Sequence, residues 1–372
     1  MKFSVARAAL HEELSLTQGV VESKSTIPIL SHMLVRTDGD GLELLATDLE
    51  VGLRTRCAAE VEGQGAAAVP ARKLHDVVRA LDGDAVHLES KSNDWVAVKS
   101  GSFNGRVVGL PEGDFPAQPA FPEDGVTVKL PLSSFHQMLS RVIFAVTTEN
   151  TRFSINGALL KITKDSVTLV ATDGHRLAYV NRAYASPELE EEMSVLVPRK
   201  ALQELLRFKV QDENEELELT AQDNHVFFRA GRRTLYARLL EGAFPRYERV
   251  LPDDNQVIAK VSREAFDAVI TRVAVLTNDT ARMVALGLSD GNLSVSTTNP
   301  NMGEASEDLP AEITGGEAKI GLNYEYIRQF LQAVPDEMIE IHLKDSSTQA
   351  LFVPGGETEL EHRYVIMPMR LS

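Results

Sequence analysis

The sequence predicts an α+β protein made of three repeats, each with two helices on one side of antiparallel sheets. An amphipathic helix pattern recurs three times along the 372 residues, with starts at Leu10, Phe135 and Phe266. An alternating strand pattern that ends in a polar turn also recurs three times, and a chain of this length can bury a separate core in each repeat.

The first helix of each repeat is predicted from apolar residues at i, i+4, i+7 and i+11, a spacing that keeps them on one helix face. The positions are Leu10, Leu14, Thr17 and Val21, then Phe135, Leu139, Val142 and Val146, then Phe266, Ile270, Val273 and Thr277. This face should pack on a sheet, which leaves the opposite face exposed.

A second amphipathic helix follows in each repeat. Its apolar positions are Leu74, Val77, Val78 and Leu81, then Leu202, Leu205 and Leu206, then Ile327, Phe330, Leu331 and Val334. Pro70 and Pro198 are expected in the first turn of two of these helices, where a missing N–H costs nothing. Asn323 stands at the same place in the third repeat and can cap the helix.

Strands are predicted at residues 42–48, 167–173 and 293–299, and each ends at a polar residue. Asp48, Asp173 and Asn299 therefore occupy one position of the repeat, where their side chains should form turns. Proline-rich or polar stretches at residues 115–122 and 250–255 separate the repeats. The predicted domains are residues 1–122, 123–253 and 254–372.

The composition excludes several classes of protein. With 43% hydrophobic and 25% charged residues, and no apolar run near the ~18 residues that span a bilayer, no membrane association is expected. The N-terminal residues lack the pattern of a signal peptide, so a cytoplasmic location is expected. A single cysteine, Cys57, excludes an internal disulfide and is interpreted as a buried strand residue.

The charge distribution bears on nucleic-acid binding. The net charge is −16, with 38 Lys and Arg against 54 Asp and Glu, and such a balance by itself argues against DNA as a partner. The duplex responds to the local field, however, so a basic surface can coexist with an acidic remainder.

An enzyme is not expected. Asp173 and His175 could be a catalytic pair, but Asp48 and Asn299 stand at the same turn without a neighbouring histidine. The sequence contains no phosphate-binding glycine loop, no nucleophile elbow and no histidine spacing typical of a metal site. Neither a cofactor nor a metal is predicted.

Five strings, at residues 1–3 (MKF), 26–30 (TIPIL), 171–178 (ATDGHRLA), 244–252 (FPRYERVLP) and 367–371 (MPMRL), resemble those of the bacterial DNA sliding clamps in order and spacing. This family is the β subunit of DNA polymerase III. The resemblance implies half of a six-domain ring, closed by a head-to-tail homodimer around double-stranded DNA without sequence preference. The ring would tether the polymerase and confer processivity, with no catalysis of its own.

The resemblance also implies an apolar pocket for short peptide motifs of the polymerase III α subunit, the δ subunit of an ATP-driven clamp loader, and other replication and repair proteins. Carried over, the pocket comprises Ile155, Thr172, Gly174, His175, Arg176, Leu177, Pro245, Arg249, Val250, Tyr326, Val365, Met367, Pro368, Met369, Arg370 and Leu371. Methionine and proline suit an adaptable apolar surface. The family's chain often ends at the leucine, and here Ser372 follows.

Basic residues near the helices would face the DNA phosphates: Arg72, Lys73, Arg79, Arg199, Lys200 and Arg207, with Lys24, Arg152 and Phe153 added from the resemblance. The candidate dimer interface comprises Lys99 and Arg106, facing Val275, Leu276, Glu304, Glu307 and Asp308. The alternative function is a threefold-repeat scaffold that binds proteins without encircling DNA.

Overall fold

The computed structural model describes residues 1–22, 26–91, 93–148, 153–278, 281–356 and 359–371, except the side chain of Phe153. It contains two compact units. Unit 1 comprises Met1–Phe135 and Val197–Leu239, and unit 2 comprises His136–Leu196 and Leu240–Ser372. The middle repeat is thus shared between the units, and the predicted domain boundaries remain a prediction.

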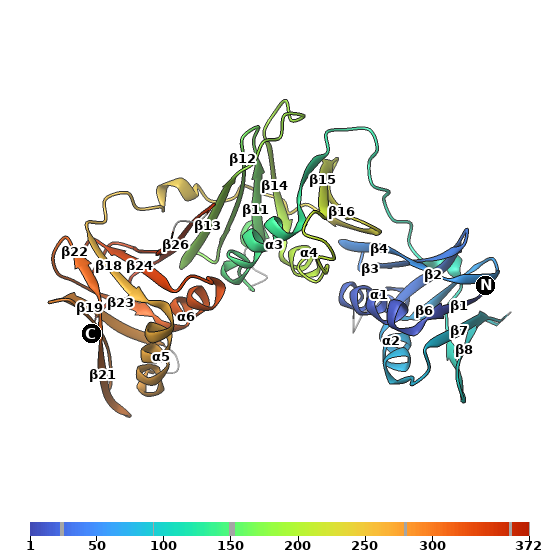
Figure 1. Cartoon of the computed structure of the whole chain (residues 1–372), viewed down its shortest axis with the longest axis horizontal. Helices are drawn as coiled ribbons and strands as arrows, with labels where there is room; N and C mark the ends of the chain where they lie inside the picture. The colour runs from blue at the N-terminus through green and yellow to red at the C-terminus, as the bar shows by residue number, and fades with distance from the viewer. Residues whose placement is uncertain (23–25, 92, 149–152, 279–280, 357–358, 372) are drawn as a thin grey trace. The chain divides into compact units, whose positions relative to one another are not determined.

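Unit 1 contains an eight-stranded and a five-stranded antiparallel sheet (Figure 1). The larger sheet has the order β10 (Val128–Pro131), β15 (Glu216–Gln222), β16 (His225–Ala230), β17 (Arg233–Arg238), β4 (Val51–Ala58), β3 (Gly41–Thr47), β2 (His32–Asp38) and β6 (Ala66–Pro70). The smaller has the order β5 (Glu60–Gly63), β1 (Lys2–Ala6), β7 (Ala85–Ser90), β8 (Trp95–Ser100) and β9 (Phe103–Val108). The pairing of β4 with β17 continues one sheet from the first repeat into the second.

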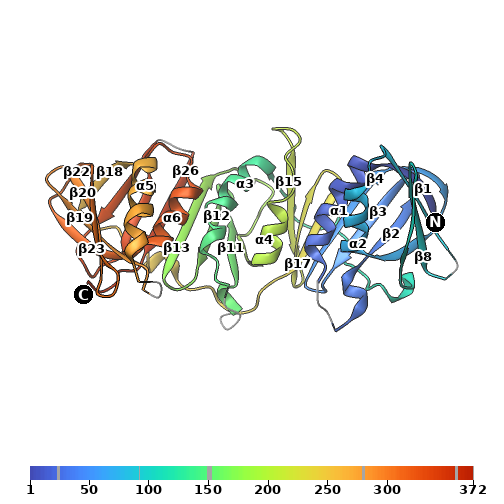
Figure 2. The same ribbon diagram turned by 90° about the horizontal axis from the view of Figure 1, so that it is seen from below.

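The helices of unit 1 are α1 (Arg7–Val20), α2 (Ala71–Ala80) and α4 (Arg199–Leu205). Figure 2 shows α1 and α2 side by side on one face of the larger sheet. The predicted apolar face of α1 is confirmed, because Leu10, Leu14, Thr17 and Val21 are all buried. Pro70 and Pro198 stand at the N-cap, one residue before the first turn in which they were predicted.

Unit 2 contains a nine-stranded and a four-stranded antiparallel sheet. The larger has the order β14 (Met193–Pro198, whose last two residues belong to unit 1), β11 (Gly157–Ile162), β12 (Ser166–Thr172), β13 (Arg176–Ala183), β26 (Leu360–Ile366), β25 (Ala350–Pro354), β24 (Met338–Leu343), β18 (Val257–Ser262) and β22 (Glu312–Thr314). The smaller has the order β21 (Gly303–Pro310), β20 (Asn292–Asn299), β19 (Met283–Ser289) and β23 (Ala318–Asn323). Here β13 pairs with β26, as β4 pairs with β17 in unit 1.

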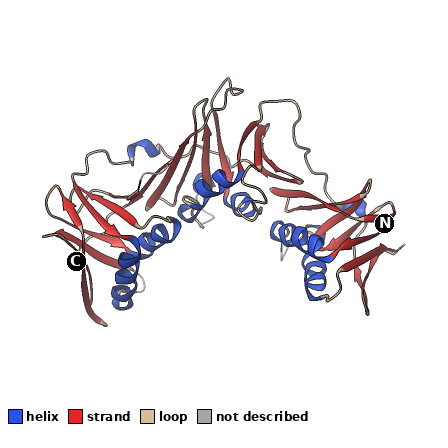
Figure 3. Ribbon diagram, in the orientation of Figure 1, coloured by secondary structure: helices blue, strands red, loops and turns tan. Residues whose placement is uncertain are grey.

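In unit 2, α5 (Arg263–Val273) and α6 (Tyr324–Ala333) lie side by side against the sheets (Figure 3). The predicted cap is confirmed, because the Oδ1 of Asn323 accepts a hydrogen bond of 2.9 Å from the Glu325 N–H. The helix α3 (Leu132–Ser140) begins in unit 1 and ends in unit 2.

Two of the predicted first helices end earlier than their apolar patterns. Val142 and Val146 are buried as predicted, but they flank a 3₁₀ turn rather than continuing α3. Thr277 likewise follows a 3₁₀ turn after α5. The 3₁₀ segments of the described chain are η1 (Pro28–Ser31), η2 (Glu112–Asp114), η3 (Ile143–Ala145), η4 (Phe153–Ile155), η5 (Tyr247–Arg249) and η6 (Ala274–Leu276).

The α+β class, with helices on antiparallel sheets, is confirmed. Cys57 is buried on β4, as predicted, and burial raises the pKa of its thiol to about 11. Among the described residues, no helix has both the length and the apolar character needed to cross a membrane.

Candidate functional site

A tight turn between β12 and β13 shapes one end of an apolar pocket in unit 2. The Asp173 Oδ1 accepts hydrogen bonds from the N–H groups of His175, at 2.9 Å, and Arg176, at 3.1 Å. The Thr172 hydroxyl donates to the Arg176 carbonyl at 2.6 Å. Gly174 has a φ of +91°, a conformation that costs glycine little. The turn therefore brings the backbone of Gly174 to the pocket wall, and no side chain of this residue takes up space there.

The same turn occurs between β3 and β4 of unit 1. The Asp48 Oδ1 accepts from the N–H groups of Glu50, at 3.0 Å, and Val51, at 2.7 Å. Leu49 stands in the position of Gly174 and has a φ of +79°. The predicted turn-forming role of the aspartate is confirmed, so Asp173 requires no catalytic explanation.

The pocket has a volume of about 690 Å³. Its walls are mainly apolar, and they come from β12, β13, β26, the segment before β11 and the segment before β18. The lining residues are Ser154, Ile155, Thr172, Gly174, Arg176, Leu177, Glu241, Pro245, Val250, Val365 and Met367. All except Ser154 and Glu241 were among the predicted pocket residues. Those two lie in connecting segments, where no strand or helix periodicity marks them.

Cross-strand pairing explains why residues so far apart in sequence meet here. Leu177 on β13 lies opposite Val365 on β26. Beyond the end of β26, the Met367 N–H donates to the His175 carbonyl at 2.9 Å. This bond anchors the chain after β26 beside the Gly174 turn, and it places the half-exposed Met367 at the pocket.

The remaining predicted pocket residues lie outside the cavity wall. His175 is exposed in the turn and Arg249 is exposed in η5. The Met369 N–H donates to the Gly321 carbonyl at 2.7 Å. Pro368, Arg370 and Leu371 belong to the same C-terminal segment, and Tyr326 lies on α6.

Arg176 connects the pocket to the core of unit 2. Its guanidinium donates to the Asp173 carboxylate at 3.0 Å and to the Phe144 carbonyl at 2.6 Å. It also donates to Gln329 and to the Tyr364 hydroxyl. The guanidinium lies over the Tyr326 ring at 4.3 Å, in cation–π geometry. Tyr326 thus supports a pocket residue from outside the wall, and Arg176 is immobilised.

The predicted DNA-facing residues fall into two groups. Arg72, Lys73 and Arg79 are exposed on α2, and Arg79 pairs with Asp76 at 3.3 Å. In contrast, Lys200 binds Asp48 and the carbonyl of Val20.

Arg207 also makes intramolecular contacts, since it pairs with Glu204 at 2.6 Å and donates to the Ser15 carbonyl. Arg199 is half-buried. Lys200 of α4 and Arg207, two residues after its end, therefore attach this region to α1 and to the Asp48 turn. Lys24, Arg152 and the side chain of Phe153 lie outside the described part of the chain.

A second basic region of unit 1 was not predicted as a site. A cavity of about 420 Å³ is lined by Arg7, Ala8, His11, Glu12, Ser15, Leu16, Arg207, Lys209 and Arg233. The sequence signal was the i, i+4, i+8 spacing of Arg7, His11 and Ser15, which places them on one face of α1.

The predicted dimer residues lie at or next to two sheet edges, one in each unit. In unit 1, β9 ends the five-stranded sheet, and its Arg106 lies over the Trp95 ring at 4.3 Å. Lys99 is exposed on the neighbouring β8. Phe103 and Val108 are exposed apolar residues of β9 that the sequence analysis missed.

In unit 2, β21 ends the four-stranded sheet. Glu304 and Asp308 are exposed on it, and Glu307 pairs with Arg272 at 2.6 Å. Val275 is largely exposed and Leu276 is half-buried in η6. The exposed Met302, just before β21, was also missed.

No cluster of three or more His, Cys, Asp or Glu side chains suited to a metal ion occurs in the described part of the chain.

Family models match the chain in three consecutive segments. The DNA polymerase III beta subunit N-terminal domain matches residues 1–119, the central domain residues 129–246, and the C-terminal domain residues 248–370. The beta sliding clamp of Pseudomonas putida is 34% identical over 372 residues, and that of Caulobacter vibrioides is 30% identical over 380 residues. Both matches cover 100% of each chain.

Among solved structures, the sliding clamp of Pseudomonas aeruginosa bound to griselimycin is 33% identical, with a TM-score of 0.93. This match also covers 100% of both chains.

Proposed function

The chain belongs to the family of beta sliding clamps, the beta subunits of DNA polymerase III, and its function is that of a DNA sliding clamp. We propose that two copies of the chain close a ring around duplex DNA. It is a processivity factor and not a catalyst. The observation that carries the function is the match of the whole chain, in order, to the three domains of that subunit.

The proposed ring closes head to tail, with β9 of one copy against β21 of the other. Both strands end a sheet, and open edges are available for pairing with another chain. The β9 edge carries Arg106 and the apolar Phe103 and Val108, whereas the β21 edge carries Glu304 and Asp308. Opposite charges around apolar residues support a heterologous contact of this kind.

The proposed contact with DNA is electrostatic. Arg72, Lys73 and Arg79 on α2 offer exposed positive charge that can approach phosphates without reading bases. Sliding requires such loose contacts, because retention is mechanical once the ring is closed. The net charge of −16 is compatible with this role, since the duplex responds to the local field.

The unit 2 pocket is the proposed site for partner peptides. Its apolar walls and the polar groups of Thr172 and Arg176 suit a short segment with apolar anchors. We assign to it the polymerase III α subunit, the clamp loader δ subunit and other proteins with clamp-binding motifs. The proposed place of action is the cytoplasm.

Retention on nicked circular plasmid, after incubation with a clamp loader and ATP, tests the ring. The protein should co-elute with circles in gel filtration and should be lost after a nuclease cuts the circle once. Equal retention on linear DNA would refute encirclement. A protein that never stays on circles, even with a loader shown to act on it, would favour the protein-binding scaffold.

A further inference from the structure

The larger sheet of unit 1 carries a second cavity, which we call the arginine groove, on the face opposite α1. Its volume is about 550 Å³. Four arginines contribute to its wall, against a single carboxylate. The lining residues are Arg54, Arg56, Gln118, Pro119, Ala120, Phe121, Glu123, Arg229, Gly231, Arg232, Thr234 and Tyr236.

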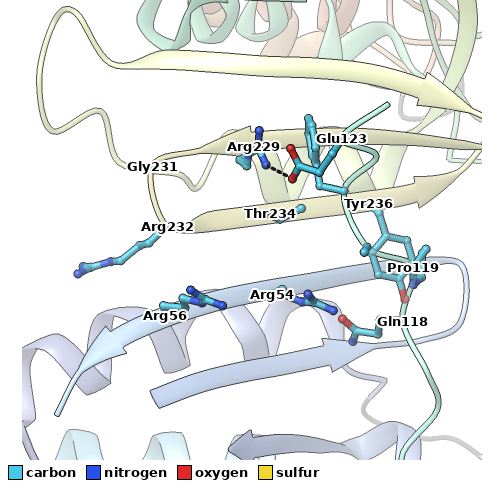
Figure 4. Close-up of a pocket in the computed structure, with 12 residues that line it drawn as sticks. Arg54, Arg56, Gln118, Pro119, Glu123, Arg229, Gly231, Arg232, Thr234 and Tyr236 are labelled. Atoms are coloured by element: carbon cyan, nitrogen blue, oxygen red, sulfur yellow. Dashed lines mark hydrogen bonds and ion pairs between the residues drawn. The ribbon is translucent and has the colours of Figure 1, made fainter. Parts of the chain in front are cut away.

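Strand alternation determines which side chains reach the groove. The Glu13 carboxylate of α1 accepts from Thr55 at 2.6 Å and from Arg233 at 2.8 Å, so both side chains point toward the helix. Their strand neighbours Arg54 and Thr234 lie opposite one another across β4 and β17 and point the other way. In Figure 4, Arg54 and Arg56 extend from β4, and Arg232 extends from the turn before β17.

The segment that connects the first two repeats forms one side of the groove. The Gln118 amide donates to the Ala46 carbonyl at 3.0 Å. Phe121 packs against Phe227, with ring centroids 6.1 Å apart, and the Arg229 guanidinium lies 3.9 Å from the Phe121 ring centroid. Glu123 pairs with Arg229 at 3.0 Å. The segment is thus held on the sheet, with the groove beside it.

The groove lies at the place in unit 1 that corresponds to the peptide pocket of unit 2. In each unit an aromatic residue of the connecting segment packs on the outer face of the sheet, Phe121 in unit 1 and Tyr247 in unit 2. The N–H of Arg238, the last residue of β17, donates to the Glu50 carbonyl at 2.8 Å, as the N–H of Met367 after β26 donates to the His175 carbonyl.

The ligand class must nevertheless differ between the two cavities. Tyr236 on β17 corresponds to Val365 on β26. The Tyr236 hydroxyl is 3.0 Å from the Thr47 hydroxyl, and its ring packs over Gly52. The Tyr236 ring therefore fills the space that corresponds to the apolar pocket. The cavity that stays open lies next to it, among arginines.

The arginines retain capacity for an anionic ligand. The Arg54 guanidinium is 3.7 Å from the buried Glu43 carboxylate, beyond hydrogen-bond distance. The Arg56 side chain is 62% exposed; its guanidinium forms an ion pair with Asp38 at 2.8 Å and lies 3.8 Å from the Glu43 carboxylate, beyond hydrogen-bond distance. The Gln118 Oε1 beside them is buried and has no hydrogen-bond partner among the described residues.

We propose that the arginine groove binds an extended acidic peptide segment of a partner protein. Arg54 and Arg56 are two residues apart on one strand, roughly 7 Å, which matches carboxylates at alternate positions of an extended peptide. Guanidinium groups bind carboxylates in bidentate geometry. A peptide is favoured over nucleic acid because the two aromatic rings of the lining, Phe121 and Tyr236, are buried, and Arg229 covers the Phe121 ring, so neither offers a free face for stacking of a base.

Fluorescence polarisation of a labelled peptide with glutamate at alternate positions, added to the full chain without DNA, tests the proposal. Wild-type protein should bind it, and Arg54→Ala/Arg56→Ala should bind roughly tenfold more weakly or worse, because two charge-assisted contacts are lost. Arg54→Lys/Arg56→Lys should lie between, since lysine keeps the charge and loses the bidentate geometry.

Three controls make the result specific. Arg238→Ala, which removes a half-exposed arginine of the same sheet outside the groove, should leave binding unchanged. Met367→Ala in the unit 2 pocket should also leave it unchanged. A peptide with lysine in place of glutamate should not bind. Thermal unfolding of each variant verifies that the fold is retained. This check is needed because the buried Glu43 carboxylate loses two nearby arginines in the double alanine variant and keeps Arg36 as a partner.

The outcomes separate this proposal from the ring. Absent peptide binding, or binding that the double alanine variant preserves, would overturn the peptide proposal while retention on circular DNA stays intact. Tighter binding of a single-stranded oligonucleotide than of the peptide, lost in the same variant, would assign the groove to nucleic acid and likewise overturn it.

Discussion

The buried His362 on β26 should make the stability of unit 2 depend on pH. Its side chain is 3% exposed, lies 5.3 Å from the Phe330 ring, and has neither ring nitrogen hydrogen-bonded to another described residue. Burial lowers the pKa of His362 from 6.5 to about 3; the charge of Arg141 acts in the same direction, and the Arg141 backbone acts against both. The imidazole is therefore neutral in the folded protein.

The sign and size follow from proton linkage. Unfolding at pH 5 takes up a proton on His362, whereas unfolding above pH 6.5 does not. The free energy of unfolding is therefore undiminished by His362 above pH 6.5, the pKa of the unfolded state, and decreases as the pH falls toward 3, the pKa in the folded state. One pKa unit corresponds to 1.36 kcal/mol, so the loss from pH 7 to pH 5 is about 2 kcal/mol.

His362→Leu should remove this part of the pH dependence, because leucine has a similar volume and cannot titrate. The assay is urea unfolding equilibrated at pH 7, 6 and 5, with pulsed hydrogen exchange at one fixed labelling pH to report β26 and α6. His175→Gln, at an exposed position of the same unit, is the matched control. An equal loss of stability in the wild type and in His362→Leu would refute the reasoning.

Three further changes have defined outcomes. Arg233→Ala should cost about 2 kcal/mol in the free energy of unfolding, because the fully buried Glu13 carboxylate loses two charge-assisted hydrogen bonds and keeps Arg232 at 3.1 Å and Thr55; an unaltered urea midpoint would contradict this. Gly174→Ala should fold with a loss of about 1 kcal/mol in the free energy of unfolding, since Leu49 adopts the same left-handed backbone conformation in unit 1. Its added methyl group lies at the pocket wall, so titration of a clamp-binding peptide should show weaker binding, and equal affinity would contradict this. Val108→Asp on β9 should convert the proposed dimer into monomers in sedimentation experiments, and a persistent dimer would exclude this edge.

Local periodicity accounts for most of the predicted fold. The apolar faces of α1, α5 and α6 are buried where the spacing placed them, because a helix face depends only on residues within a few turns. Helix ends were predicted less well. Val142 and Val146 continue the apolar pattern and are buried, yet the chain leaves the α-helix near Ser140 and reaches them through a 3₁₀ turn. Burial and helix continuation are separate properties, and the pattern reports only burial.

The candidate pocket was predicted mainly through resemblance, and the structure supplies its physical basis. Strand pairing brings Leu177 and Val365 together across 188 positions, and no local pattern could indicate that register. Ser154 and Glu241 were missed because the connecting segments have no periodicity. Lys200 and Arg207 were correctly assigned to a helix region, but their carboxylate and carbonyl partners depend on how α4 packs on α1.

Composition and neighbouring residues along the chain are sufficient to predict the α+β class, the threefold repeat, the Asp48 and Asp173 turns and the burial of Cys57. Which arginines line an open cavity depends on tertiary packing. Arg54 and Arg56 lie beside a cavity while Arg233 neutralises a buried Glu13, although all three belong to adjacent strands. The physical reason is that alternation assigns side chains to two faces of a sheet, whereas packing decides which face meets a helix and which stays open.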